Sequence, residues 1–206
     1  MFLRPVVLLL VVTGLLAAQV IEFESGGLKY QTLSKNGLTV MFAHLPIQVR
    51  EYSVLQVAAS NGAATPCTVR PENFVFSRSD GFTVRASSAE SVVGELLDKA
   101  GRNDVIKLTS TYEMGLYGMV RFRSTNGYEQ RRRSALAEVV STKLKAAAAA
   151  SAIAFVETRL KPGESTDGAV FFPTLGRPLG GGKLRFTAAG QWFEFDVEPT
   201  PSNASQ

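Results

Sequence analysis

Residues that bind metals or form disulfides are almost missing from this sequence. The chain of 206 residues contains one cysteine, Cys67, and one histidine, His44. A single cysteine excludes a disulfide framework and a CxxC redox site, and a single histidine excludes zinc fingers, HExxH proteases and other sites that need several imidazoles. We therefore expect no metal site, no cofactor and no catalytic residues, and we expect that the protein is not an enzyme.

A strong excess of one charge is also missing. The chain has 22 lysines and arginines and 18 aspartates and glutamates, a net charge of +4. This excess is far weaker than the basic faces of nucleic-acid-binding proteins, so we expect no nucleic-acid partner. With 45% hydrophobic and 19% charged residues, the composition is that of a globular domain with a core, and it excludes disordered and coiled-coil classes.

Residues 1–18 have the pattern of a secretory signal peptide. Arg4 gives a positive start, the run from Val6 to Leu16 is mostly apolar, and two alanines precede Gln19. A membrane-spanning helix needs about 20 apolar residues, so we expect cleavage, with an uncleaved anchor as the alternative. No cysteine stands directly after the run, where a lipid would be attached. The sequence predicts an exported protein, periplasmic or secreted, without a transmembrane span after signal cleavage.

Short runs of β-branched and aromatic residues predict strands on both sides of a central segment. The clearest hairpin covers 183–197, where a loop of two or four residues at Ala189-Gly190 would place Phe186 opposite Phe193 and Arg185 opposite Glu194. The expected strands are 37–45, 52–60, 73–77, 82–86, 155–160, 169–172 and the two arms of that hairpin.

The central segment changes to helical spacing. Ser87 and Glu90 form a capping box before a helix that ends at Gly101. Apolar residues spaced by three and four predict further helices at about 104–117 and 127–153. The second of these ends in the alanine run 146–150, which favours helix but offers little side chain to a core.

Strands on both sides of helices favour one antiparallel β-sandwich, because neither set alone is large enough to bury two sheet faces. We therefore expect a single mainly β domain over 19–198 with a helical insertion at about 87–153, and a disordered tail at 199–206. Two separate domains are the alternative.

Three segments carry a resemblance to a known family: VLQVAASNGAATPCTVRPENFVFSRSDGFTVRA, LKPGESTDGAVFFP and FEFDVEP. Together they resemble the small immunoglobulin-like module of unknown function found in bacterial lipoproteins and exported proteins. The resemblance implies an immunoglobulin-like sandwich used for binding or assembly, with no active site. The helical insertion and the missing lipoprotein cysteine depart from that family. The residues that match its turns and strands are Asn61, Phe76, Asp80, Gly81, Pro162, Gly163, Gly168 and Phe172.

Two features are candidate binding sites. Basic residues gather in the insertion and could attract an anionic partner, although a solvated helix face is the ordinary alternative. The single tryptophan, Trp192, points outward in the expected register and could contact a ligand or lie under the helices. The basic candidates are Arg121, Arg123, Arg131, Arg132 and Arg133.

Three function classes follow. The first is an exported, non-enzymatic binding or scaffolding module of the bacterial cell envelope, whose partner is an unknown envelope protein. The second binds a polyanionic or membrane surface through the basic insertion, and the third is a glycan-active enzyme that uses carboxylates alone.

Glu194, Asp196 and Glu198 share one strand face, which we interpret as a solvated face neutralised by Lys183 and Arg185. The insertion packs on the sandwich or mediates self-association.

Overall fold

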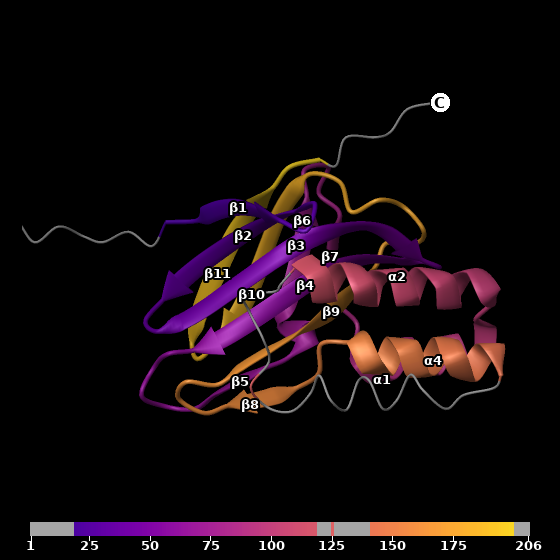
Figure 1. Cartoon of the computed structure of the whole chain (residues 1–206). Helices are drawn as coiled ribbons and strands as arrows, with labels where there is room; N and C mark the ends of the chain where they lie inside the picture. Colours follow the sequence, from indigo (N-terminus) through magenta and orange to yellow (C-terminus); the bar gives the residue numbers. More distant parts are fainter. Residues whose placement is uncertain (1–18, 119–124, 126–140, 200–206) are drawn as a thin grey trace, which may run out of the picture.

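The protein has three layers. A four-stranded sheet packs on one face of a five-stranded sheet, and helices cover the other face (Figure 1). The computed structural model describes residues 19–118, 125 and 141–199. Its strands are β1 Ile21–Ser25, β2 Leu28–Lys35, β3 Leu38–Val49, β4 Tyr52–Asn61, β5 Cys67–Val69, β6 Phe74–Arg78, β7 Thr83–Arg85, β8 Thr158–Leu160, β9 Ser165–Pro173, β10 Gly182–Ala188 and β11 Gln191–Val197; its helices are α1 Ala89–Lys99, α2 Arg102–Gly118, α4 Thr142–Ile153 and the short 3-10 helix η1 Pro71–Asn73.

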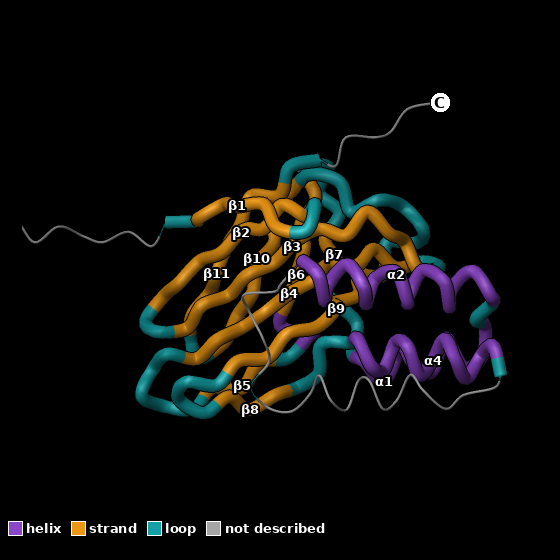
Figure 2. The backbone as a smooth tube through the Cα atoms, in the orientation of Figure 1, coloured by secondary structure: helices purple, strands orange, loops and turns teal. Residues whose placement is uncertain are grey.

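Strands from both ends of the chain share the same sheets. The five-stranded sheet has the order β1-β2-β3-β4-β9, the four-stranded sheet has the order β11-β10-β6-β7, and β5 pairs with β8. All of these pairings are antiparallel. The strands after the helices, β9 and β10, lie beside β4 and β6, which precede them (Figure 2). The predicted mainly β fold with antiparallel sheets and intervening helices is therefore confirmed.

The middle of the five-stranded sheet is buried on both faces. In β3, Val40 and Phe42 belong to the core between the sheets, whereas Met41 and Ala43 belong to the core under the helices. Successive side chains of a strand point to opposite faces, so a strand buried on both sides needs a continuous apolar run. This explains why β3 and β4 contain so few charged residues.

The hairpin of β10 and β11 has the predicted register. Phe186 lies opposite Phe193, and Arg185 lies opposite Glu194. Ala189 and Gly190 form a two-residue turn, and both have positive φ, at 50° and 71°. Such a turn matches the right-handed twist of the flanking strands.

The alanine run contributes more to the core than the sequence suggested. Ala146, Ala149 and Ala150 are buried in the core between the helices and the five-stranded sheet. The expectation that 146–150 adds little core is wrong, because small side chains let α4 lie close to α1 and α2. Only the part of the predicted helix 127–153 from Thr142 onward is a described helix.

The helix cap and the first strands also differ from expectation. The cap of α1 is Ser88, whose hydroxyl accepts a hydrogen bond from the backbone of Ser91, while Ser87 donates its backbone N–H to Phe171. Three strands were not predicted: β1, β2 and β5. β1 and β2 form a hairpin through Gly26 and Gly27, both of positive φ, a turn signal that the sequence does contain.

None of the described helices is long and apolar enough to cross a membrane.

Candidate functional site

The structure bears on only one of the predicted binding candidates. The five arginines lie outside the described residues. Trp192 is 55% exposed on the outer face of β11, as expected from the register. The ammonium of Lys35 lies 4.7 Å from its ring centre and the guanidinium of Arg185 lies 5.5 Å away. The indole ring therefore already makes cation–π contacts within the protein.

Glu194 and Asp196 of β11 pair with Lys183 and Arg185, as the sequence predicted, whereas Glu198 pairs with Lys29 instead. Glu194 accepts hydrogen bonds from Lys183 at 2.9 Å and Arg185 at 2.8 Å. Lys183 also lies 3.3 Å from Asp196. The hydrogen bonds from Arg185 and Lys183 lower the pKa of Glu194. A general acid needs a raised pKa, so this carboxylate has the wrong environment for that role.

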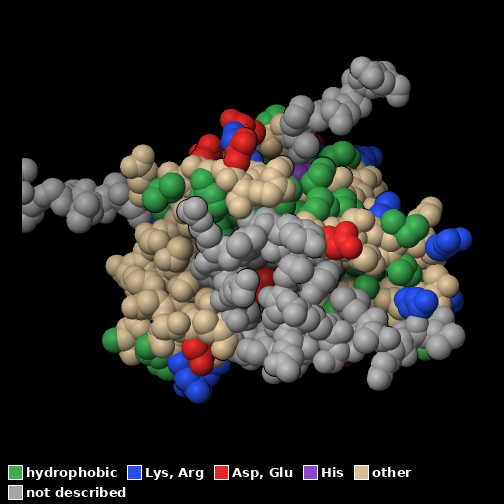
Figure 3. Space-filling model, viewed as in Figure 1, with side chains coloured by type: hydrophobic (Ala, Val, Ile, Leu, Met, Phe, Trp, Pro, Cys, Tyr) green, Lys and Arg blue, Asp and Glu red, His purple; other side chains and the backbone are tan. Residues whose placement is uncertain are grey.

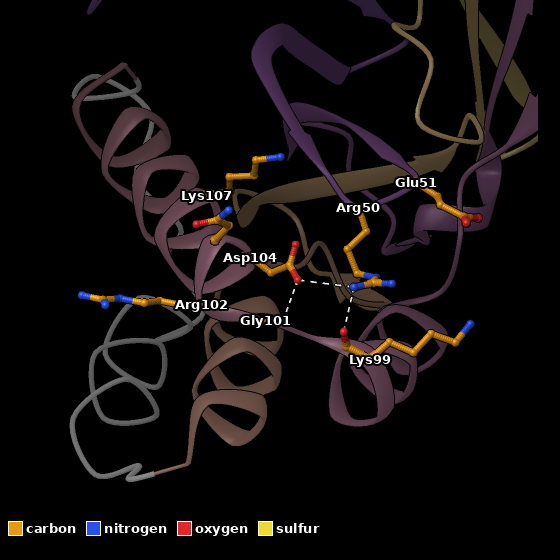
Figure 4. A pocket seen from close by; sticks show the side chains of 8 residues that line it. Arg50, Glu51, Lys99, Gly101, Arg102, Asp104 and Lys107 are labelled. Atoms are coloured by element: carbon orange, nitrogen blue, oxygen red, sulfur yellow. Dashed lines mark hydrogen bonds and ion pairs between the residues drawn. The ribbon is translucent and has the colours of Figure 1, made fainter.

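A polar hollow lies where α1 meets α2, and we call it the α1–α2 hollow. It encloses about 570 Å³. The turn between β3 and β4 forms one wall, and the first turns of α2 form the other (Figure 4). Its lining residues are Arg50, Glu51, Lys99, Gly101, Arg102, Asn103, Asp104 and Lys107.

Arg50 fixes the geometry of the hollow. Its Nη1 donates to the carbonyl oxygen of Lys99 at 2.7 Å and lies 3.5 Å from the Asp104 carboxylate. Asp104 also accepts the backbone N–H of Gly101 at 2.8 Å, which caps the start of α2. Glu95 lies 3.8 Å from the Arg50 Nε. The turn of the sheet and the two helices are thus held together by one guanidinium.

The rim of the hollow is basic. Lys99, Arg102 and Lys107 are exposed, and the side chains of Lys99 and Arg102 extend away from the Arg50–Asp104 pair (Figure 4). The first residues of α4 add Lys143, whose ammonium donates to the Asp98 carbonyl at 2.7 Å. Basic side chains gather at this end of the helical layer in the space-filling view (Figure 3). Diverging cations of this kind suit an extended anionic surface better than one small anion.

A second cavity, the sandwich-end pocket, opens between the two sheets near the end of β11. It encloses about 380 Å³. Here the side chains that point inward between the two sheets are polar, whereas those of the neighbouring core are apolar. Along β3 the inward side chains pass from Phe42 to His44, and along β2 they pass from Leu33 to Gln31. The lining residues are Gly27, Leu28, Lys29, Gln31, Phe42, His44, Pro46, Val197, Glu198 and Pro199.

The lone histidine and the lone cysteine lie in different environments. His44 is half-buried in the sandwich-end pocket, and burial lowers its pKa. Cys67 is buried in the core between the sheets, as expected for a small apolar residue, and burial raises its pKa. Across the described part of the chain, no group of three histidine, cysteine, aspartate or glutamate side chains is placed to hold a metal ion.

The α1–α2 hollow could not be predicted from the sequence, because its parts are far apart in the chain. Arg50 and Lys99 are 49 residues apart. One local signal was available: Asp104 stands three residues after Gly101, the spacing of a helix cap.

Comparisons of the chain with models of known families, with curated proteins and with solved structures find no match.

Proposed function

We propose that the protein is an exported, non-enzymatic binding module of the bacterial cell envelope, and that it binds an anionic surface through the basic rim of the α1–α2 hollow. The observation that best supports this proposal is the excess of basic residues around the hollow. Four basic residues and two acidic residues line the hollow, and Arg50 and Asp104 already contact each other at its centre. The cations of the rim remain exposed for an external partner.

The supporting framework makes this rim a rigid surface. α1, α2 and α4 share a core with the five-stranded sheet, and Arg50 joins that sheet to both helices of the hollow. A rigid set of charges loses less conformational entropy on binding than charges on a free arm. This supports recognition by the surface of a folded module.

Export of the protein and its resemblance to the immunoglobulin-like module are part of the same proposal. Residues 1–18 supply the signal-peptide pattern. The resemblance to the immunoglobulin-like module of exported proteins is supported by two antiparallel sheets that share a core built from strands before and after the helices. Under this proposal, the helical layer is an addition to the module that supplies its binding surface.

The test is co-sedimentation of the purified protein with phospholipid vesicles. Each cation close to an anionic membrane contributes about 1 kcal/mol, so R102E/K107E should weaken binding to phosphatidylglycerol-containing vesicles at least about tenfold. Binding should also fall as salt rises from about 0.05 to 0.5 M, because salt screens exposed charges. Neutral phosphatidylcholine vesicles should not bind.

The matched control is R159E/K161E. Arg159 and Lys161 are also exposed, they lie on β8 and the turn after it, and their reversal changes the net charge by the same amount. Equal losses in the two variants would show that net charge alone matters and would overturn the assignment to the rim. A parallel titration with soluble polygalacturonate separates a carboxylate polymer from a lipid surface as the source of the anionic groups.

A further inference from the structure

Within the described part of the chain, most edges of the two large sheets are covered or short, and one is open. Side chains of β2 protect the edge of β11, since Lys35 donates to the Trp192 carbonyl at 2.8 Å and Gln31 donates to the Asp196 carbonyl at 2.9 Å. The edge of β9 is bonded along its length, because Thr125, Phe155 and Ser87 donate backbone N–H groups to the carbonyl groups of Ser165, Ala169 and Phe171. β7 has only three residues.

β1 is the exception. It is the outermost strand of the five-stranded sheet, and among the described residues no strand pairs with its second edge (Figure 1). Ile21 is 61% exposed and Phe23 is 41% exposed. A five-residue edge strand with exposed apolar side chains is a template for the addition of another strand.

The two faces of β1 have different chemistry. Ile21 and Phe23 lie on the face that carries the helices, where the Phe23 ring stacks on Tyr30 with ring centres 5.3 Å apart. Glu22 and Glu24 lie on the opposite face and pair across the sheet with Gln31 and Lys29. A strand added to β1 would therefore meet apolar side chains on one face and carboxylates on the other.

The carboxylate face has more negative than positive charge. Lys29 lies 3.8 Å from Glu22 and 3.2 Å from Glu198, and Glu24 stands opposite it in the adjoining strand. Three carboxylates thus share one ammonium at this corner of the described structure. The hydrogen bond from Lys29 to Glu198 raises the pKa of Lys29, and the charges of Glu198, Glu22 and Glu24 raise it further.

A second copy of the chain does not fit this edge well. An antiparallel pair of β1 strands centred on Phe23 would place Glu22 of each copy opposite Glu24 of the other. Like charges directly opposite each other destabilise a strand pair. The charge pattern favours a partner with basic residues at alternate positions.

We infer that the free edge of β1 is a docking site for an extended polypeptide segment in which apolar and basic residues alternate. The segment adds as an antiparallel sixth strand to the five-stranded sheet. Its apolar side chains lie beside Ile21 and Phe23, and its basic side chains lie beside Glu22 and Glu24. This inference goes beyond the proposed function, because its partner is basic and docks away from the α1–α2 hollow.

The probe is the peptide acetyl-Ser-Val-Lys-Val-Arg-Val-Lys-Ser-amide, titrated into the purified protein and followed by calorimetry and by amide hydrogen exchange. We expect measurable binding and slower exchange of the outward β1 amides. The double substitution E22K/E24K should weaken binding at least about tenfold, because each favourable cross-strand pair becomes repulsive. The same variant should bind a matching peptide with glutamate at the basic positions.

Two controls separate strand addition from simple charge attraction. E113K/E157K reverses two exposed carboxylates outside β1, and it should bind the probe as the unmodified protein does. A probe that carries N-methyl groups on alternate residues keeps its charges but loses backbone hydrogen bonds, so it should fail to bind. Failure of the unmodified protein to bind the probe would overturn the inference, as would equal binding of the methylated probe or of E22K/E24K.

Discussion

Substitution of Leu96 tests whether the helical layer is part of the fold. Leu96 has no exposed surface and lies in the core between α1 and the five-stranded sheet. Removal of a fully buried leucine side chain costs about 2–5 kcal/mol, from lost transfer free energy and from the cavity that remains. With no exposure at this site, we expect Leu96→Ala to lower the free energy of unfolding by about 3–4 kcal/mol.

The next residue provides the control. Leu97 lies on the same helix but is 40% exposed, so Leu97→Ala should cost about 1 kcal/mol or less. Urea unfolding followed by circular dichroism and by Trp192 fluorescence measures both changes. With a slope of about 2 kcal/mol per molar urea, the midpoint of Leu96→Ala should fall about 1.5–2 M below that of the unmodified protein. Equal midpoints for the two variants would mean that α1 does not pack on the sheet.

Two further predictions concern the packing of α4 and the behaviour at high pH. Ala150 is fully buried, so Ala150→Leu should destabilise the fold by about 1–3 kcal/mol through overpacking. Ala148 is only half-buried, and Ala148→Leu should change the same urea midpoint much less; the reverse order would contradict the packing of α4. Burial raises the pKa of Tyr30 and Tyr52 to about 12, aided by the charge of Asp167 at Tyr30 and by a hydrogen bond to Glu95 at Tyr52. The unfolded chain ionises these groups near their ordinary pKa of about 10, so stability should fall as pH rises from 10 to 12, and ultraviolet titration should show both tyrosines ionising late. Ionisation of all the tyrosines near pH 10 in the folded protein would contradict their burial.

The sequence predicted the parts of the fold that depend on local pattern. The β10–β11 hairpin was placed to the residue because alternation fixes each side chain on one face, and a one-residue shift would exchange the faces. The start of α1 was one residue in error, since both Ser87 and Ser88 are possible caps and the bond from Ser87 to Phe171 decides between them. That hydrogen bond joins segments that are far apart in the chain, so no local sequence pattern predicts it.

The three-layered arrangement and the candidate sites could not be predicted from the sequence, because they too depend on contacts between distant segments. β4 has buried residues on both faces, but a short apolar run predicts a strand without showing what covers it. The role of Arg50 depends on contacts with Lys99 and Asp104 across the molecule. The basic character of the helices was visible in the sequence, whereas the hollow that Arg50 organises was not.

The central claim is that the helix-bearing end of a rigid, three-layered protein is its binding surface. Hydrogen–deuterium exchange of the purified protein, with and without phosphatidylglycerol-containing vesicles, tests this claim most directly. We expect slower exchange in 99–107 and in the turn at Arg50, with the exchange of β10 and β11 unchanged. Slower exchange confined to β10 and β11, or no change at 99–107 while vesicles are bound, would contradict it.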